Sequence, residues 1–499
     1  MLKYRDLSIF GSALSIFLWD TRTKVPPGAA GLRSQQICLF SQLETNMAND
    51  PEIRYLLENV VKEKTYRSFN ELQKRNIYLI KNRYIKRIQS PLGLNSEIEK
   101  QKIVSYEAWK KAKASKDFGV FKPELRKLFE LKKQAAEIQM KDRGSKTSYD
   151  LLIDYYDPKI TEDIIAKNFD LLRRGLTPII EKCTASRLKV DRSILNQRIP
   201  VPLQREFSRA IADFVGFDTS SKSAKGRIDE TDHSFTTGYF DDVRIGLHYY
   251  EDLFQLPIFE MLHECGHAIY MQNLNREWMC QPLADACSEG FQESQSRFFE
   301  NIVGRSREFW AYFLPVLKKL SSENFSGMSV DQMYRAVNVV EPTKIRIEAD
   351  EVTYSLHIII RFELERDLFS GKMSVDELPQ AWNQKYSDYL GVDVKDDAEG
   401  VLQDVHWAHG YFGYFPSYAL GNILSGQILH KMSQEVPLWR EFIEKGSFGE
   451  VRRWMTDNIY CYGNLYNPLD LLEKITGEGI NPEHFISYLK EKYSKIYCF

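Results

Sequence analysis

The 499-residue chain is predicted to be mostly α-helical and to form one large domain with a groove. Long charged segments carry apolar residues at three- and four-residue spacing, which is the pattern of amphipathic helices. With 43% hydrophobic and 27% charged residues, the chain can bury an extensive core. No linker rich in Pro, Gly or Ser divides the sequence, so one domain or two closely packed halves are expected.

Helices are expected along most of the chain. The first contains the apolar run 7–18 and is expected to be buried, because no good cleavage site follows its faint likeness to a secretory signal. Further helices are expected at 67–88, 95–114, 122–142, 160–186, 205–218, 306–322, 330–337, 343–368, 375–390 and 417–433. Residues 244–250 alternate in polarity and are the best strand candidate, in a short sheet lining a cleft.

Composition and charge argue against several classes of protein. The formal net charge is −2, and acidic residues are interspersed among the Lys and Arg of the long helices, so nucleic acid is not an expected partner. No apolar run reaches the length of a transmembrane helix, so no membrane partner is expected. The seven Cys are scattered, odd in number and without a Cys-x-x-Cys pair, which favours free thiols in a reducing, cytoplasmic compartment.

The most informative motif is His263-Glu264-Cys265-Gly266-His267. On a helix, positions four apart share a face, so the two His can bind one metal ion while Glu264 handles a water proton. Cys265 points away from that face and is interpreted as a small buried apolar residue. Gly266 costs a helix about 1 kcal/mol relative to Ala, which is explained if another element must approach closely there. The alternative is two surface histidines on an ordinary helix.

A third metal ligand must come from elsewhere, because a catalytic zinc usually has three protein ligands and one open position. The helix-like segment 288–300 carries Glu289 and Glu293 one turn apart on the same face. One could bind the metal while the other fixes a metal-binding histidine through its second nitrogen. Spacing alone does not choose between them, and a solvated acidic helix face is the alternative.

Further strings occur in a regular order along the chain. They are 18–28 (LWDTRTKVPPG), 232–235 (DHSF), 242–244 (DVR), 292–297 (QESQSR), 345–354 (IRIEADEVTY), 400–407 (GVLQDVHW) and 413–422 (GYFPSYALGN). Together with the metal motif they resemble the Taq carboxypeptidase family of zinc metallocarboxypeptidases. The resemblance extends from about residue 10 to the C-terminus.

This resemblance implies a fold, an activity and a quaternary structure. The fold is a zincin-like, neurolysin-like helical domain over residues 1–499, with a deep central substrate channel and a helical cap formed by residues 1–145. The activity is removal of C-terminal amino acids from peptides that have a free C-terminus. The resemblance makes Glu293 the third ligand of one zinc ion per chain, with cobalt as an alternative metal, and implies a homodimer.

The mechanism expected from this site is attack of a metal-activated water on a peptide carbonyl. Glu264 accepts a proton from the water and then delivers a proton to the leaving amine. A further donor must stabilise the oxyanion. Tyr414 is the first choice for this donor, with Tyr418, His406 and His409 as alternatives, and each of these is otherwise an aromatic core residue or a buried histidine.

A carboxypeptidase also needs a cation for the free carboxylate of its substrate, and Arg matches a carboxylate bidentately. The resemblance places Arg346 and Arg244 near the cleft. Their alternative role is a buried ion pair, with Asp350 or Asp242 as the expected partner. Further substrate-binding candidates in the groove are His233, His406 and Tyr418.

Three positions depart from the family pattern. Gln292 stands where the family has His, Ser234 where it has Pro, and Gly246 where it has Thr. All three lie where substrate ends would be held, so they affect specificity more than reaction type. Two other functions stay open on the sequence. One is a metallo-oligopeptidase with the same metal site, and the other is a catalytically impaired peptide-binding homologue.

Overall fold

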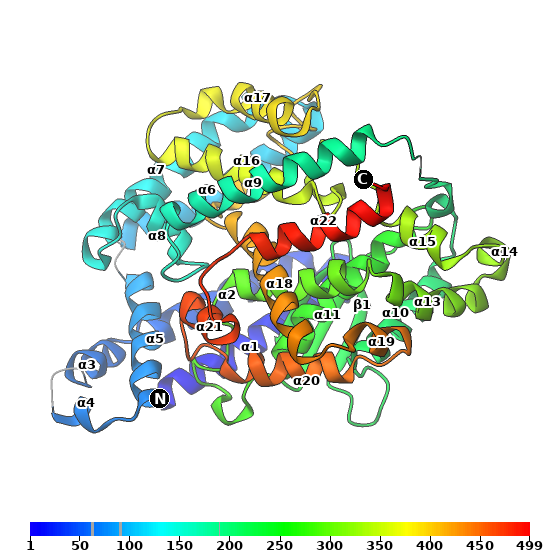
Figure 1. The fold of residues 1–499 in the computed structure, drawn as a ribbon. Helices are drawn as coiled ribbons and strands as arrows, with labels where there is room; N and C mark the ends of the chain where they lie inside the picture. The colour runs from blue at the N-terminus through cyan, green and yellow to red at the C-terminus, as the bar shows by residue number, and fades with distance from the viewer. Residues whose placement is uncertain (61–63, 89–91, 189) are drawn as a thin grey trace.

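The computed structural model describes residues 1–60, 64–88, 92–188 and 190–499. The described residues form a large, predominantly helical body with one small sheet, which confirms the predicted mostly α fold (Figure 1). The N-terminal helices are α1 (Leu2–Thr23), α2 (Ala30–Ala48), α3 (Pro51–Val60), α4 (Lys64–Ser68), α5 (Glu71–Ile88), α6 (Leu92–Ser115) and α7 (Phe118–Arg143). They are followed by α8 (Ser148–Asp154), α9 (Glu162–Ala185) and α10 (Val201–Val215).

The middle of the chain supplies the sheet, the helix that carries the metal motif and the helix that carries Glu289 and Glu293. These elements are β1 (Gly226–Glu230), β2 (Phe235–Tyr239), β3 (Asp242–Leu247), α11 (Gln255–Gln272) and α12 (Glu289–Arg297), which continues into the π-helical segment η4 (Phe298–Val303). The C-terminal half contains α13 (Arg307–Leu320), α14 (Ser322–Phe325), α15 (Val330–Ala336), α16 (Tyr354–Phe369), α17 (Leu378–Leu390), α18 (Pro416–Glu435), α19 (Trp439–Glu444), α20 (Gly449–Asn458), α21 (Pro468–Thr476) and α22 (Glu483–Tyr497).

Local chemistry accounts for many helix ends. The side chain of Thr161 accepts a hydrogen bond from Ile164 N–H at the start of α9, and Ser288 accepts one from Phe291 N–H at the start of α12. Such caps satisfy N–H groups that have no partner inside the helix. At the other end, α10 stops at Gly216, which has a φ of 85° that a side chain would disfavour.

The sheet has the order β1-β3-β2, in which β3 pairs with β1 in parallel and with β2 antiparallel. The predicted strand at 244–250 is confirmed as β3, although it begins two residues earlier and ends at Leu247. β2 and β3 pack against α11, so the small sheet supports the helix that carries the metal motif.

Two large apolar clusters form the core. One collects side chains from β3, α10, α11, α12, η4 and α13, and the other collects side chains from α8, α9, α16, α17 and α22. Side chains of α18 belong to both clusters. α12 packs against α11 and α18. α22 packs along α9 and α18, as Figure 1 shows. The metal-motif helix therefore lies in the interior of the body, held from several sides.

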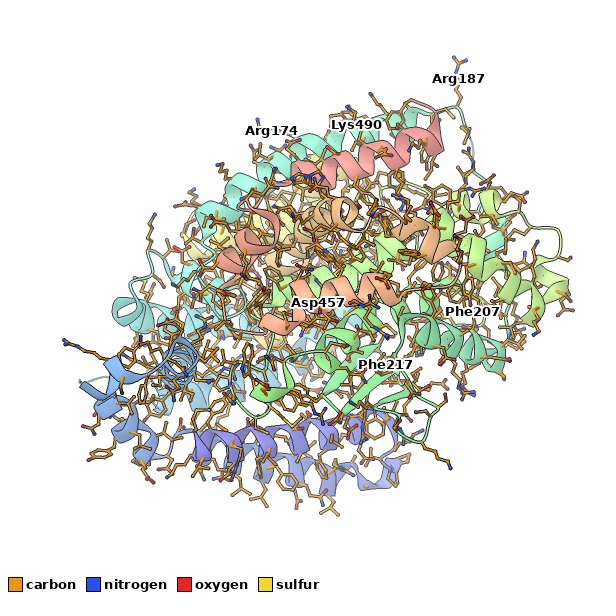
Figure 2. The ribbon with its side chains drawn as sticks, turned by 60° about the horizontal axis from the view of Figure 1, so that its bottom comes forward. Arg174, Arg187, Phe207, Phe217, Asp457 and Lys490 are labelled. Atoms are coloured by element: carbon orange, nitrogen blue, oxygen red, sulfur yellow. The ribbon has the colours of Figure 1, made fainter. Side chains whose placement is uncertain are left out.

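Apolar side chains are buried and charged side chains are exposed, as the helical periodicity predicts. Phe207 of α10 and Phe217 just after it are buried, whereas Arg174 of α9, Arg187 and Lys490 of α22 project from the surface (Figure 2). All seven cysteines are free thiols. Over the ranges that the structure describes, we find no helix whose length and apolar character would let it cross a membrane.

Two expectations about helices are wrong. The helix predicted at 343–368 begins only at Tyr354, because tertiary hydrogen bonds engage the backbone before it. Gln403 accepts a hydrogen bond from Arg346 N–H, and Asp350 accepts from the N–H groups of Val352 and Thr353. Such side-chain bonds compete with a helix.

The first helix is not buried. In α1, Leu14 and Trp19 are buried, but Leu2 is 69% exposed and Ile9 is 53% exposed. The reason is that α1 packs on α2 and on β2 and is covered only partly by them. The apolar run at 7–18 therefore faces the core along one side only.

Candidate metal centre and substrate cavity

Helix α11 presents the metal motif from a buried position. Glu264, Cys265 and Gly266 are buried, while the imidazoles of His263 and His267 are partly exposed. The burial of Cys265 agrees with its interpretation as a small apolar residue. Because positions 263 and 267 lie one turn apart, both imidazoles point to the same side of α11, and their ring centroids are 5.1 Å apart.

Gly266 allows α12 to lie directly on α11. A Cβ atom at this position would be 2.6 Å from Gln295 O and 2.6 Å from Ser296 Cα, closer than side chains tolerate. On the far side of α12, a Cβ atom at Gly421 of α18 would be 2.6 Å from Glu293 Cβ. Two glycines thus let α12 pass between α11 and α18, as the sequence predicts for Gly266.

This close packing brings Glu293 to the two histidines. Ligand atoms of His263, His267 and Glu293 all lie within 4.8 Å of one another, and His263 Nε2 is 3.8 Å from Glu293 Oε2. Glu289 is outside this group, although it lies on the wall of the same cavity. Two imidazole nitrogens and one carboxylate oxygen converging on one point form a set of donors suited to a divalent metal ion.

His263 is held from behind by a carboxylate. Its Nδ1 lies 2.9 Å from Glu300 Oε2, and Arg297 donates a hydrogen bond to the same oxygen at 3.1 Å. Burial raises the pKa of Glu300, but Arg297 and His263 outweigh burial and bring this pKa down to about 2. Glu300 is therefore ionised, and it favours the tautomer in which His263 Nδ1 carries the proton and Nε2 can bind a metal.

His267 has a different partner. Its Nδ1 lies 3.1 Å from Gln292 Oε1, so the neutral amide oxygen accepts the Nδ1 proton and leaves Nε2 available. The expectation that Glu289 would fix a histidine is wrong, since Glu300 and Gln292 occupy these positions among the described residues. The amide at 292 supplies a hydrogen-bond acceptor where the family pattern has an imidazole.

Two carboxylates at the centre are themselves oriented. Thr236 of β2 donates a hydrogen bond to Glu264 Oε2 at 2.6 Å, which leaves the other oxygen of Glu264 free of this contact. Ser296 donates to Glu293 Oε2 at 3.0 Å. Burial raises the pKa of Glu293, but the nearby His263, His267 and Arg297 outweigh burial and lower it, so this carboxylate is ionised.

A cavity of about 680 Å³ opens over the metal centre. Its walls come from α5, from β2, from the 285–289 segment and α12, and from α18. Tyr414 and Tyr418 lie on one wall with ring centroids 5.2 Å apart. Burial raises the pKa of Tyr414 well above its usual value, so its hydroxyl stays protonated and can donate a hydrogen bond.

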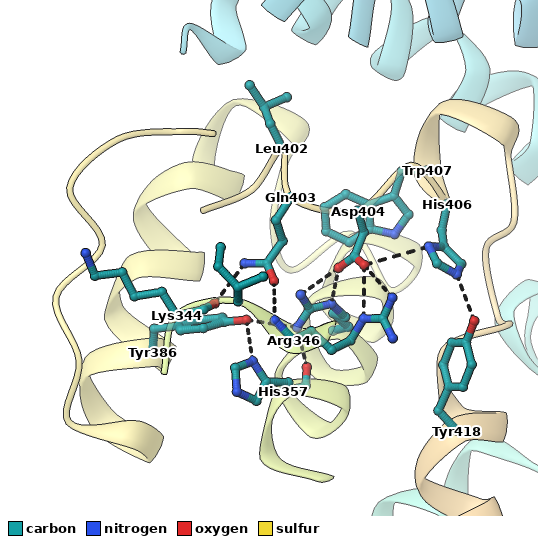
Figure 3. A network of polar contacts seen from close by, with 12 residues as sticks. Lys344, Arg346, His357, Tyr386, Leu402, Gln403, Asp404, His406, Trp407 and Tyr418 are labelled. Carbon is teal, nitrogen blue, oxygen red and sulfur yellow. Dashed lines mark hydrogen bonds and ion pairs between the residues drawn. The ribbon is translucent and has the colours of Figure 1, made fainter. Parts of the chain in front are cut away.

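Arg346 lies behind Tyr418 in a buried ionic network (Figure 3). Its Nη2 is 2.8 Å from Asp404 Oδ1, and Arg361 contacts the other carboxylate oxygen at 2.6 Å. Asp404, and not Asp350, is therefore the ion-pair partner of Arg346, so that part of the sequence expectation is wrong. The guanidinium of Arg346 lies 5.0 Å from the centroid of the Tyr418 ring and is not part of the cavity wall.

His406 belongs to the same network. Its Nε2 lies 3.2 Å from Tyr418 Oη, and burial lowers its pKa to about 3, so the imidazole is neutral (Figure 3). His409 stacks on Tyr106 with ring centroids 4.8 Å apart and is not part of the cavity wall. Neither histidine is part of the cavity wall, but His406 contacts two residues of that wall, Tyr418 through this hydrogen bond and Tyr414 with ring centroids 5.7 Å apart.

The other two substrate-binding candidates belong to the sheet region: Arg244 lies on the central strand β3, and His233 comes just before β2. Arg244 makes two hydrogen bonds to Asp242, at 2.6 and 2.9 Å, and lies 4.2 Å from the ring centroid of Trp19. The pairing with Asp242 agrees with the expected alternative role. His233 is exposed, and neither His233 nor Arg244 is among the residues that form the cavity wall.

The structure accounts for Ser234 and Gly246, two of the residues that depart from the family pattern. Gly246 of β3 lies opposite Phe235 of β2, and a Cβ atom at Gly246 would be 2.7 Å from the Phe235 ring. Ser234 donates a hydrogen bond to Glu260 Oε2 at 2.5 Å and accepts one from His248 N–H at 3.2 Å. The hydroxyl at 234 thus makes bonds that a proline cannot, and the glycine accommodates the Phe235 ring.

Several residues at the centre were not expected from the sequence. Glu300 lies in the segment 288–300 and follows Glu293 by two helical turns. This spacing puts both residues on one helix face, which could have identified Glu300 from the sequence. Thr236 carries no such signal. Asp157 also went unrecognised: it accepts hydrogen bonds from Gly290 N–H at 2.9 Å and from Ser417 at 2.5 Å, and so joins the start of α12 to α18.

Comparison with known proteins identifies the family of this chain. Residues 2–493 match the family described as carboxypeptidase Taq (M32) metallopeptidase. The chain is 37% identical over 497 residues to carboxypeptidase 1 of Bacillus subtilis (strain 168), covering 99% of this chain and 97% of the relative. It is 36% identical over 500 residues to thermostable carboxypeptidase 1 of Thermus thermophilus, with the same coverage.

Comparison with solved structures indicates the same family. The M32 carboxypeptidase from Deinococcus radiodurans R1 superposes with a TM-score of 0.95 at 32% identity, covering 100% of this chain and 98% of that chain. A Pyrococcus furiosus carboxypeptidase structure described as Apo-Mg superposes with a TM-score of 0.93 at 33% identity, covering 99% of this chain and 97% of that chain. This chain therefore belongs to the carboxypeptidase Taq (M32) metallopeptidase family.

Proposed function

We propose that this protein is a zinc-dependent carboxypeptidase that removes amino acids from the C-terminus of peptides. Family membership supports a metallocarboxypeptidase with peptide substrates. The observation that carries the proposal is the convergence of His263, His267 and Glu293 within 4.8 Å, with Glu264 beside them on the wall of the same cavity. Such a set of residues is suited to metal-assisted hydrolysis.

The donors fit zinc. Two imidazole nitrogens and one carboxylate leave one coordination position open for water, which is the usual arrangement of catalytic zinc, and cobalt is an alternative metal. The Nδ1 atoms of His263 and His267 face Glu300 and Gln292, so both Nε2 atoms are left for the ion. When bound, zinc would polarise the scissile carbonyl and acidify the attacking water.

Glu264 is the proposed general base and acid. It takes a proton from the attacking water and passes it to the nitrogen of the leaving amino acid. The hydrogen bond from Thr236 to Glu264 Oε2 supports this role, because it holds the carboxylate in one orientation toward the cavity. Glu264 is only 7% exposed, and burial of this kind limits competing contacts with bulk solvent.

Tyr414 is the proposed donor to the oxyanion. Its place on the cavity wall and its protonated hydroxyl support this role. Tyr418, on the same wall, is a proposed substrate-binding residue. Arg346 and His406 are proposed to contribute through Tyr418, which both contact, while the positions of Arg244 and His233 give no support to direct substrate binding.

The remaining parts of the proposal concern the whole chain. Residues 1–145 are proposed to form a cap over the cleft, and the place of α5 on the cavity wall supports this. A cytoplasmic location is supported by seven free thiols. A homodimer is proposed from the family resemblance alone, and light scattering of the purified protein tests it.

The proposed activity is tested with a mixed peptide pool analysed by mass spectrometry. We expect stepwise C-terminal shortening that stops when a chelator is added, and no shortening of the same peptides with amidated C-termini. Internal cleavage of amidated peptides would identify an endopeptidase instead. Glu264→Gln is expected to keep its metal and to lower kcat/KM by roughly 10²–10⁴. Glu277, which is exposed and is not part of the cavity wall, provides the matched control, Glu277→Gln.

A further inference from the structure

One cation on the cavity wall makes hydrogen bonds only to uncharged groups. Arg75 of α5 donates through Nε to the backbone carbonyl of Asn464 at 2.8 Å. Its Nη1 donates to Asn467 Oδ1 at 2.9 Å, and its Nη2 donates to Asn464 Oδ1 at 3.0 Å. The guanidinium also lies 5.0 Å from the centroid of the Tyr78 ring. None of these contacts neutralises the charge.

Arg83, a neighbouring cation of α5, is engaged differently. It forms an ion pair with Asp285 at 2.8 Å and also contacts Tyr4. For Arg75, by contrast, no carboxylate in the described part of the chain lies within the 4.0 Å that defines an ion pair. Arg75 is thus distinct from Arg83 on the same wall.

The described hydrogen bonds of Arg75 do not use all the N–H groups of its guanidinium. A guanidinium has five N–H groups, and the three described bonds use three of them. Arg75 is partly buried, and burial lowers its pKa, although a guanidinium stays charged in proteins. A partly desolvated charge with unused donors is stabilised by an anion, and a carboxylate matches the fork.

The acceptors that hold Arg75 are themselves fixed. Asn464 N–H donates to Leu283 O at 3.0 Å, and the Asn467 amide donates to Asp470 Oδ2 at 2.9 Å. Because both partners are anchored, the guanidinium is held in place before any ligand arrives, which lowers the entropy lost on binding. Leu283 precedes α12, whereas Glu293 lies in the middle of it, so Arg75 is anchored away from the metal ligands.

We propose that Arg75 is a carboxylate-binding residue of the substrate cavity and that it selects peptides bearing an acidic group. This inference rests on the proposed peptidase function and deepens it by naming a substrate class. The carboxylate comes from a Glu or Asp side chain of the peptide or from its C-terminal carboxylate. Both have the same planar geometry, and the experiment separates them.

The test uses acetylated hexapeptides in which a single Glu or Gln is moved along the chain, each as free acid and as amide. Binding is measured calorimetrically with the metal-loaded Glu264→Gln protein, with and without Arg75→Gln, so that turnover does not interfere. We expect the wild-type Arg75 background to prefer Glu over Gln about tenfold at one position, and Arg75→Gln to remove this preference. Loss of the free-acid over amide preference instead assigns the C-terminal carboxylate to Arg75.

Two controls separate a binding role from a structural one. Arg83→Gln removes an equal charge from the same wall, and an equal loss of preference in this variant would overturn the assignment, because the general potential of the cavity would then be responsible. If Arg75 only held Asn464 and Asn467 in place, Arg75→Gln would weaken Glu and Gln peptides, and free acids and amides, all to the same extent, which would also overturn the assignment. Arg75→Lys, which keeps the charge, is expected to retain part of the preference.

Wild-type kinetics make the two proposals independent. If the wild-type protein hydrolyses no peptide of the series, the proposed peptidase function fails while the binding titrations still test Arg75. If it hydrolyses the peptides but Glu and Gln substrates have equal kcat/KM at every position, and free acids and amides bind equally, the inference about Arg75 fails. The kinetic comparison of Glu and Gln substrates needs no variant and is unaffected by misfolding, whereas free acids and amides are compared with the Glu264→Gln protein.

Discussion

Gly266 of α11 and Ser296 of α12 meet backbone to backbone: a Cβ atom on Gly266 would lie 2.6 Å from Ser296 Cα. This contact sets how near α12 comes to the metal motif, and Glu293 lies one turn before Ser296 on that helix. The position of the third proposed ligand therefore depends on the absence of a side chain at 266.

Gly266→Ala is expected to destabilise the protein in spite of the better helix propensity of Ala. The added methyl group must push α12 away or be compressed, and overpacking of this kind costs about 1–3 kcal/mol. Chemical denaturation measures the loss, and metal content measures the displacement of Glu293. Gly449→Ala on α20 is the matched control, because nothing lies within 4 Å of its Cβ position. Equal stability of the two variants would contradict this account of Gly266.

Gln292→Leu is expected to weaken metal binding by roughly 10- to 100-fold, because His267 Nδ1 loses its hydrogen-bond acceptor. Gln292→Glu is expected to bind metal more tightly than wild type, since a carboxylate is a stronger acceptor. Competition with a chelating dye at fixed pH gives the dissociation constants. Gln384→Leu, on the exposed face of α17, is the control. An unchanged affinity in Gln292→Leu would show that the amide does not orient His267.

Glu293→Ala is expected to release the metal ion, whereas Glu289→Ala is expected to retain it. The two carboxylates are one turn apart on α12, but only Glu293 has an oxygen near both histidine ligand atoms. Metal analysis of the purified variants after dialysis distinguishes them directly. The opposite result, with metal lost from Glu289→Ala and kept in Glu293→Ala, would show that the ligand has been assigned to the wrong residue.

Glu365 of α16 is expected to make folding stability depend on pH. It is fully buried and accepts hydrogen bonds from Trp407 Nε1 at 2.7 Å, Gly413 N–H at 2.8 Å and Tyr149 Oη at 2.9 Å. Burial raises the pKa of Glu365 from its ordinary value of 4.5 to about 7, and the three donors offset burial only in part. The folded state therefore binds a proton that the unfolded state releases above pH 4.5.

The sign of the effect follows from this difference. A raised pKa in the folded state contributes stability that is present below pH 4.5 and is lost as the pH rises to about 7, by about 3 kcal/mol at roughly 1.4 kcal/mol per pH unit. The stability advantage of wild type over Glu365→Gln should therefore shrink by about this amount across that range. Denaturant titrations at both ends of the range measure it. An advantage that is constant or grows with pH would contradict the raised pKa.

Local patterns were sufficient for much of the fold. The spacing of apolar residues predicts α5, α6, α7, α9, α10, α13, α15, α17 and α18 to within a few residues of their ends, and the strand expected at 244–250 overlaps β3. These features depend on neighbours along the chain, which the sequence shows directly. The predicted ranges do not include α2, α3, α8 or the helices from α19 to α22. Residues 343–353 were expected to be helical and are not, because bonds from Gln403 and Asp350 hold that backbone in a non-helical form.

Some features of the candidate site likewise follow from local sequence, and others depend on how the helices pack. The sequence by itself determined that His263 and His267 share one face of a helix with Glu264 beside them, since helical geometry places residues four positions apart together. Spacing left Glu289 and Glu293 open, the family resemblance favoured Glu293, and the tertiary structure brings Glu293 to the histidines. Only the tertiary structure decided that Glu300 and Gln292 hold the histidines from behind and that Arg346 pairs with Asp404. Those contacts join segments distant along the chain, and such contacts are decided by how the helices pack and not by spacing along one of them.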